Sequence, residues 1–178
     1  CKTTIVFDHH RRSSDTITGA VLSYVDPYAS SACEMVTEMI QYVDDGIKLK
    51  AFEADALYAG ISIDTDGFNS KSGPRTFEAA AFLRRHGADV TRVRKMLRND
   101  MDEYKAIASA VSKAEVYKDA FAITIFDGAG LESPTIGGAK AANQLLDISG
   151  IKASFVITAY EDKLYISARS IDLSLIHI

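Results

Sequence analysis

The residues with the clearest chemical potential lie together near the start of the chain, in the stretch IVFDHHRR. An apolar run ends at Asp8, and His9, His10 and Arg11 follow without a gap. Carboxylate and imidazole groups at the end of a buried strand are a usual place for a metal or phosphate site in α/β proteins. Neighbouring side chains of an extended backbone alternate, so we expect one imidazole to bind a metal and the other to face a substrate or a supporting partner. Chance pairing of two solvated histidines is the competing interpretation.

A second candidate acid, Asp64, ends the apolar segment AFEADALYAGISI and stands two residues before Asp66. An Asp-Gly pair that ends a helix is common, so a purely structural role for these acids is the simpler interpretation. Unlike Asp66, Asp64 directly follows the apolar residues 61–63, where a carboxylate needs a charged partner or a metal to offset its desolvation. We therefore favour Asp64 as the functional acid of the two.

Two other places are suited to an anion. Ser30 and Ser31 precede a predicted helix, and the Ser31–Glu34 spacing is that of a capping box, which explains these residues without a ligand. The free N–H groups and the dipole of a helix start would also suit a phosphate. Arg75 begins another predicted helix, where the dipole disfavours a cation, so we interpret it as a residue that binds an anion.

Two patterns carry less weight. The glycines of Gly128-Ala129-Gly130 and Gly137-Gly138 lack the spacing of a dinucleotide-binding loop, and no acidic residue follows on a second strand. Cys33 lies inside a predicted helix with no histidine in the pattern, which favours a buried thiol.

The bulk composition limits the classes of protein. The chain has 178 residues, of which 47% are hydrophobic, and a net charge of −4, which suits one domain or two small ones. No basic stripe is present, which argues against binding of long nucleic acid but leaves a small polyanion open. Two cysteines indicate a reducing compartment. No apolar run of about 18 residues and no signal peptide is found, so we expect a soluble, cytoplasmic chain without membrane contact.

The elements that must position these residues fall into two parts. The first part begins with a strand at 3–7, and the second contains a strand, a helix and a hairpin. The predicted helices of the first part cover 31–43, 51–63, 76–86, 89–98 and 100–116. The second part has strands at 121–126, 153–159 and 163–169 and a helix at 136–148. The fold class is α/β, with domains at 1–117 and 118–178, and the second is a smaller α+β domain. A single strand before so many helices, and the tail LSLIHI, indicate a piece of a longer protein.

Six segments resemble the DHH and DHH-associated phosphoesterases: VFDHHRR, DPYASSACEMVTEMIQY, AGISIDTDGFNSKSGPRTFEAAAFLRRHGAD, AANQLL, ASFVI and ISARS. Within that family they are most similar to membrane-anchored cyclic-di-AMP phosphodiesterases of the GdpP type. The resemblance covers about residues 4–172, and 59–89 is its most specific block. It implies the C-terminal part of a parallel-sheet DHH domain, mostly its helices, followed by part of a DHH-associated substrate-binding domain.

The resemblance also implies a reaction and its metals. The family hydrolyses cyclic di-AMP to pApA with two divalent ions, preferably manganese, by two-metal hydrolysis. His9 would bind one ion, and Asp64 would complete the shell of that same ion. Asp8 would orient the neighbouring imidazole by a hydrogen bond, and His10 would face the substrate phosphate.

Further residues fall on the substrate side by the same resemblance. Ser30, Ser31 and Arg75 match positions that line the nucleotide pocket, Arg11 follows the histidines, and Arg169 matches an arginine of the DHH-associated domain.

The chain also departs from the family pattern. The first two metal-binding motifs and the glycine-rich GGGGH motif are missing, and Asn143 stands where the family often has Asp. The second metal then lacks its ligands, so we expect this chain alone to be inactive or nearly so. The parent is expected to be anchored to the cell membrane with this region on its cytoplasmic side, and a homodimer is an option for it.

Three alternatives stay open. The first is a DHH nanoRNA or pApA phosphodiesterase, the second a non-catalytic nucleotide-binding fragment, and the third a truncated product without a role. Histidine with carboxylates would suit manganese, zinc or iron comparably.

Overall fold

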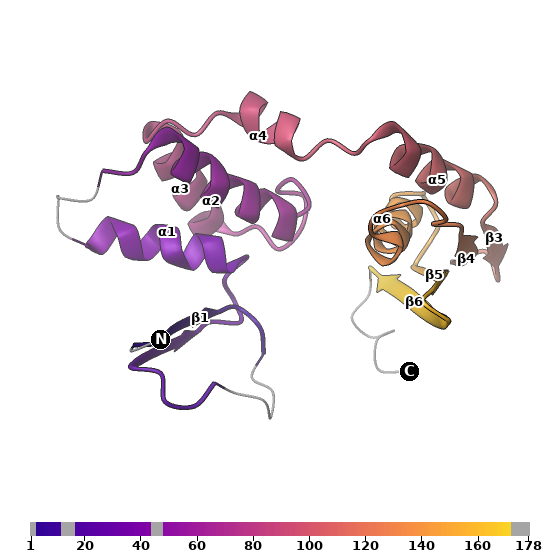
Figure 1. Ribbon diagram of the computed structural model, residues 1–178, viewed down its shortest axis with the longest axis horizontal. Coiled ribbons are helices and arrows are strands. Elements are labelled where there is room, and N and C mark those ends of the chain that lie inside the picture. The colour runs from indigo at the N-terminus through magenta and orange to yellow at the C-terminus, as the bar shows by residue number, and fades with distance from the viewer. Residues whose placement is uncertain (1–2, 12–16, 44–47, 172–178) are drawn as a thin grey trace. The chain divides into compact units, whose positions relative to one another are not determined.

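The computed structural model describes residues 3–11, 17–43 and 48–171. It has the expected α/β class, with helices and strands in two compact units, Cys1–Arg98 and Asn99–Ile178 (Figure 1). The tail residues 173–178, used above as a sign of a longer protein, lie outside the described residues.

The first unit contains two parallel strands, β1 (Ile5–Asp8) and β2 (Leu22–Val25). Asp8 pairs with Val25, so both strands end at the same edge, and the Asp26 N–H donates to the Asp8 carbonyl at 2.9 Å. The prediction of a single strand here is wrong. β2 is mostly exposed, and its sequence LSYV lacks the continuous β-branched and apolar run that marks β1 in the sequence.

In the described residues of the first unit, four helices complete the fold, each close to its predicted range. Each helix start has a recognisable cause. Ser31 and Asp89 accept hydrogen bonds from N–H groups in the first turn of the first and fourth helices. At the start of the second helix the Glu53 side chain accepts from the Lys50 N–H, and the third helix begins with a proline. The helices are α1 (Ala32–Tyr42), α2 (Ala51–Asp64), α3 (Pro74–Arg85) and α4 (Val90–Met96).

Helix α2 is the centre of this unit and contacts α1, α3 and α4 (Figure 1). Its apolar residues build a core with α3, made of Ala54, Ile61, Ala79, Leu83 and Ala88. The close approach of α1 to α2 depends on Gly60, because a Cβ there would lie 2.3 Å from Cys33 Sγ. This packing fixes the end of α2, and therefore the backbone of Asp64, one turn beyond Gly60.

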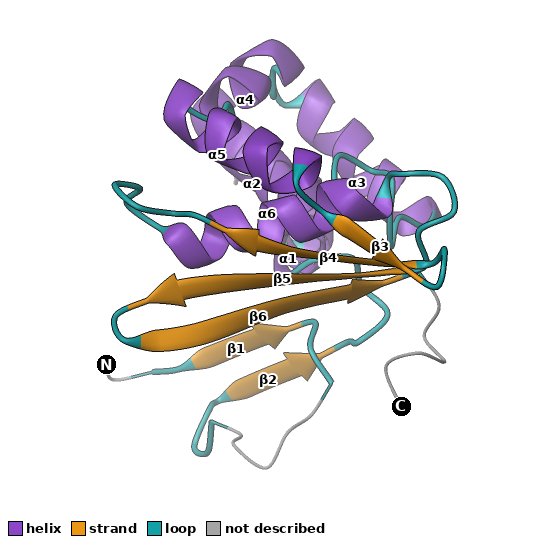
Figure 2. Ribbon diagram, turned by 90° about the vertical axis from the view of Figure 1, so that its right-hand side faces the viewer, coloured by secondary structure: helices purple, strands orange, loops and turns teal. Residues whose placement is uncertain are grey.

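The second unit is a four-stranded mixed sheet with two helices. Figure 2 shows its strands side by side in the order β3-β4-β5-β6, with the central pair parallel and both outer pairs antiparallel. In chain order the elements are α5 (Met101–Ser112), β3 (Glu115–Tyr117), β4 (Phe121–Phe126), α6 (Pro134–Leu146), β5 (Ala153–Tyr160) and β6 (Lys163–Ser170). The predicted hairpin is confirmed, and Glu161 and Asp162 turn it with positive φ angles of 49° and 57°.

Both helices cover one face of this sheet. Thr124 on β4 donates to the Ala110 carbonyl of α5, and Ser154 on β5 donates to the Ala142 carbonyl of α6. Gly138 lets α6 approach the sheet, because a Cβ there would lie 2.2 Å from the hydroxyl of Thr158. The core between the layers contains the fully buried Phe126, Leu145 and Val156, among others.

One predicted helix is shorter than expected, because α5 ends at Ser112 and residues 115–117 form β3. Helix α5 packs in the second compact unit, whereas the sequence placed it before a boundary at 117. The assignment of the two parts to DHH and DHH-associated domains stays a prediction. None of the helices in the described residues has the length and apolar content needed to cross a membrane.

Candidate active site

The imidazole of His9 and the carboxylate of Asp64 converge in the first unit. His9 Nε2 lies 3.7 Å from Asp64 Oδ2, and the two side chains are 17% and 42% exposed. β1 ends one residue before His9, and α2 ends at Asp64. Two atoms that bind one ion at about 2.1 Å each cannot be more than about 4.2 Å apart. The pair is therefore placed to supply two ligands to one cation.

The two adjacent histidines differ in exposure but do not point to opposite sides. Their ring centroids are 4.4 Å apart with a tilt of 51°, because β1 ends at Asp8 and the chain bends at His10. The alternation expected for an extended backbone does not apply here. The His9 side chain is largely covered, whereas that of His10 is 77% exposed. His10 is thus open to a ligand from solution.

Asp8 contacts His10, whereas its expected partner was His9. Its Oδ1 accepts from the His10 N–H at 2.9 Å and lies 2.8 Å from His10 Nδ1. These hydrogen bonds, the backbone one first, hold the pKa of Asp8 below its ordinary value. The carboxylate therefore fixes the orientation of the exposed imidazole.

Ser30 and Ser31 are buried at the start of α1. Ser31 Oγ accepts from the Glu34 N–H at 3.0 Å, so the predicted capping role is confirmed. In a capping box, the Glu34 side chain would accept from the Ser31 N–H. Here it accepts from Ser30 Oγ instead, at 2.5 Å. Both serines are at most 1% exposed. A direct contact of either hydroxyl with substrate stays a prediction.

Arg75 has partners within the fold. It donates two hydrogen bonds of 2.7 Å to the carboxylate of Glu38 on α1 and one of 2.8 Å to Asp26 at the end of β2. The helix start alone suggested an anion from outside the fold as the explanation for Arg75, but the partners in the structure are the carboxylates of Glu38 and Asp26. No external anion is needed to neutralise Arg75, because two carboxylates already balance its charge. Its role in substrate binding stays a prediction.

Sequence reasoning missed both partners of Arg75. Hydrogen bonds, from Arg75 first and from the Tyr28 N–H second, lower the pKa of Asp26. One signal was available for Asp26, since it follows a short apolar run just as Asp8 does. Glu38 shows no such signal, because it lies on the polar side of a helix.

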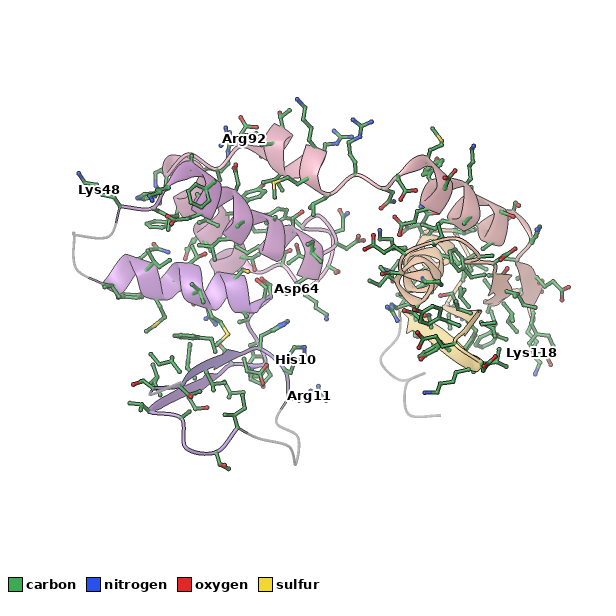
Figure 3. The ribbon with its side chains drawn as sticks, in the orientation of Figure 1. His10, Arg11, Lys48, Asp64, Arg92 and Lys118 are labelled. Carbon is green, nitrogen blue, oxygen red and sulfur yellow. The ribbon has the colours of Figure 1, made fainter. Side chains whose placement is uncertain are left out.

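The remaining candidates are arginines in different units. Arg11 is exposed and follows His10 in the first unit, and Figure 3 shows both, with Asp64 at the end of α2. Arg169 belongs to β6 of the second unit, where its Nε donates to Asn143 Oδ1 at 2.8 Å. The amide of Asn143 thus serves as an acceptor, as a carboxylate would at that position.

The donor set near Asp64 suits a divalent ion only in part. No group of three or more His, Cys, Asp or Glu side chains that could hold a metal is found in the described residues. Burial, and then the charge of Asp64, raises the pKa of the Cys33 thiol, so this neighbour is expected to stay protonated. The two groups that fit a shared ion are therefore His9 and Asp64.

Comparison with known proteins identifies the family of the chain. Residues 1–61 match the profile described as the DHH family, N-terminal domain. The cyclic-di-AMP phosphodiesterase PdeA of Listeria monocytogenes serotype 1/2a (strain 10403S) is 42% identical over 168 residues, which are 94% of this chain and 25% of that protein. The cyclic-di-AMP phosphodiesterase GdpP of Bacillus subtilis (strain 168) is 40% identical over 169 residues, which are 94% of this chain and 26% of that protein. The chain thus spans about a quarter of the length of these relatives.

A solved structure also shares the fold. The crystal structure of an exopolyphosphatase-related protein from Bacteroides fragilis aligns with a TM-score of 0.81 at 20% identity, covering 96% of this chain and 51% of that one. At this identity the likeness shows the fold alone. The profile over residues 1–61 and the relatives that are 40–42% identical over 94% of this chain lead to one assignment: the chain belongs to the DHH family.

Proposed function

We propose that this chain is part of a metal-dependent phosphodiesterase that hydrolyses cyclic di-AMP to pApA in second-messenger turnover. The observation that carries the proposal is the 3.7 Å approach of His9 Nε2 to Asp64 Oδ2 at the end of β1. The cyclic-di-AMP phosphodiesterases that are 40–42% identical to this chain support the proposed substrate. Manganese is the proposed metal, and the longer protein is proposed to hold two such ions.

His9 and Asp64 would bind one ion, each through the atom that faces the other residue. A bound divalent ion supplies Lewis acidity, which neutralises phosphate charge and activates water. Asp8 holds His10 at Nδ1, which leaves Nε2 of the exposed ring facing solution. When that nitrogen is protonated, it can donate to a phosphate oxygen and stabilise developing negative charge. Arg11 adds a positive charge next to it.

The other substrate-side residues are proposed with different contributions. Ser30 and Ser31 would act through the first turn of α1, whose geometry they fix, rather than through exposed hydroxyls. Arg75 would hold the helices around the edge where β1 and β2 end, and Arg169 would contribute from the second unit. For the longer protein, we propose membrane anchoring with this region on the cytoplasmic side, and a homodimer.

A non-catalytic nucleotide-binding role is the second candidate. It is favoured by the small number of metal donors, since only two converge in the part of the chain that the structure describes. The nanoRNA or pApA phosphodiesterases are a further option within the same family.

Calorimetry and a turnover assay separate these functions. The 178-residue chain and a longer form of the protein would each be titrated with Mn²⁺, then with cyclic di-AMP and pApA. We expect the longer form to hydrolyse cyclic di-AMP faster than pApA, and we expect His9→Ala and Asp64→Ala to lose activity and to bind Mn²⁺ more weakly. Asp66→Ala is the matched control and should change neither. Preferred turnover of linear dinucleotides would overturn the substrate assignment, and binding without turnover in the longer form would support the second candidate.

A further inference from the structure

The guanidinium of Arg169 is held by neutral groups. Its Nε donates to Asn143 Oδ1 at 2.8 Å, and its Nη1 donates to the Ala168 carbonyl at 2.9 Å. None of the ion pairs found among the described residues includes Arg169. Two hydrogen bonds therefore orient this guanidinium, and neither of them brings a carboxylate that would balance its charge.

Arg75 shows the opposite arrangement in the first unit. Its guanidinium donates to the carboxylates of Glu38 and Asp26, so its charge is balanced within the fold. An arginine that is paired with carboxylates has little left to offer a phosphate, whereas one that is held by amide and carbonyl oxygens keeps its charge for it. The two arginines therefore differ in what they can bind, although both were expected on the substrate side.

The position of Asn143 is set by the packing of α6 on the sheet. Ser154 on β5 donates to the Ala142 carbonyl at 2.7 Å, and both residues are fully buried. The register pairs Ser154 with Arg169 on β6, so these two side chains lie on the same face of the sheet, the one that α6 contacts. Asn143 directly follows Ala142 and meets the Arg169 side chain there. A buried contact thus places the amide beside the arginine.

The outer end of the guanidinium remains available in this orientation. Nη2 has no hydrogen-bond partner in the part of the chain that the structure describes, and Nη1 has a second N–H beyond the one that Ala168 accepts. Two N–H groups at the end of a planar guanidinium match two oxygens of one phosphate group. Asp147, one turn beyond Asn143 at the end of α6, makes none of the ion pairs seen between described residues.

We propose that Asn143 is a positioning residue that directs Arg169 toward a phosphate group without neutralising it. The inference rests on the proposed function, from which it takes the phosphodiester of a cyclic dinucleotide as the anion. An aspartate at this position would have nearly the same size and would hold Nε more strongly, but its charge would oppose the phosphate. The neutral amide therefore gives Arg169 a fixed direction and leaves its charge for the anion.

A phosphate titration of the 178-residue chain tests the proposal without relying on turnover. Nuclear magnetic resonance would follow the Nε–H signal of Arg169 as inorganic phosphate is added at low ionic strength. We expect Asn143→Asp to weaken phosphate binding by at least roughly threefold, because the added charge lies within hydrogen-bonding distance of the guanidinium. Gln144→Glu is the matched control, since it adds the same charge at the next exposed position of α6 and should have a much smaller effect.

The free energy of unfolding separates this role from a purely structural contact. Asn143→Asp turns a neutral hydrogen-bond acceptor into an ion-pair partner of Arg169, so its urea midpoint should be no lower than that of Gln144→Glu. A purely structural role predicts that phosphate affinity follows stability, whereas the proposal predicts that affinity falls while stability does not. An Arg169 signal that does not respond to phosphate in the native chain would overturn the proposal. So would equal weakening of phosphate binding by Asn143→Asp and Gln144→Glu.

Kinetics of the longer form, with Mn²⁺, connect the contact to the substrate. Asn143→Asp should raise KM for cyclic di-AMP by roughly threefold or more with a smaller change in kcat, since a bound phosphate is contacted in both the ground state and the transition state. In an Arg169→Ala background the same substitution should add little, because no guanidinium remains to be neutralised. An equal rise of KM in that background would overturn the proposal. Phosphate binding as expected, without turnover of cyclic di-AMP in any form, would overturn the proposed function while supporting the role of Asn143.

Discussion

His9 and Asp64 lie 3.7 Å apart although one follows the first strand of the chain and the other ends its second helix. Two independent features set this distance. The end of β1 fixes the His9 backbone, and the packing of α2 against α1 at Gly60 fixes that of Asp64. A divalent ion would therefore bind at a place where a strand edge and a helix end meet, as is common in α/β proteins.

We predict that His9→Ala and Asp64→Asn each weaken Mn²⁺ binding by roughly tenfold or more, since each removes a ligand. The double variant should lose little more than either single variant, because the two groups would bind the same ion. Isothermal calorimetry on the folded variants measures this, with Asp66→Asn as the control. Fully additive losses would show that the two residues do not share an ion.

Part of this site follows from local sequence. A carboxylate next to an apolar helix end needs a partner, and Asp64 has His9. Ser31 caps α1 as its spacing indicates. Strand β4 and the hairpin also match their predicted ranges closely, because runs of apolar and β-branched residues and short turns are strong local signals.

The rest depends on contacts between distant segments. Strand β2 is short and mostly exposed, so only its pairing with β1 identifies it. The partners of Arg75 lie 37 and 49 positions away, and no local pattern joins them. The bend at His10 is a third case, because alternation of side chains holds only while a strand continues.

We predict that Gly60→Ala destabilises the first unit by about 1–3 kcal/mol, because its Cβ would overlap Cys33 Sγ between α1 and α2. The shift of α2 should also move Asp64 away from His9 and weaken Mn²⁺ binding. Urea unfolding and calorimetry measure the two effects. Cys33→Ala in the same chain should recover part of both losses, since it removes the overlapping sulfur. Equal destabilisation with and without Cys33 would contradict this cause.

Asp55 gives a prediction about pH. It lies on α2 and accepts from Arg92 Nε and the Asp89 N–H, both at 2.7 Å. The hydrogen bond from Arg92, followed by that from Asp89, lowers the pKa of Asp55. A lowered folded-state pKa contributes stability that is fully present above the unfolded value, about 3.9, and is lost as the pH falls through the folded value.

Asp55→Asn should therefore lower the urea midpoint at pH 7, and the difference from the native chain should shrink as the pH falls below about 4. Urea titrations of both proteins between neutral and acidic pH give this comparison. Asp66→Asn is the control, because Asp66 is an exposed acid two residues beyond α2. A difference that stays constant down to acidic pH would mean that the charge of Asp55 contributes nothing.

Arg75 distinguishes a residue that holds the fold from one that binds substrate. Its three hydrogen bonds join α3 to α1 and to the end of β2, beside the edge that carries His9. We expect Arg75→Ala to cost about 1–2 kcal/mol of unfolding free energy, discounted because the side chain is partly exposed. Arg85→Ala, on the exposed last turn of the same helix, should cost much less.

The longer form of the protein, assayed with Mn²⁺, separates the two roles kinetically. If Arg75 acts by positioning, Glu38→Gln should lower the activity in the same direction as Arg75→Ala, because the amide keeps only one acceptor for the two bonds and turns an NH2 donor toward the guanidinium. If Arg75 binds substrate directly, Arg75→Ala should raise KM strongly, whereas Glu38→Gln should leave KM unchanged or lower it, since it frees the guanidinium for a phosphate. We predict the first pattern, because in this structure two carboxylates already neutralise the charge that a phosphate would need.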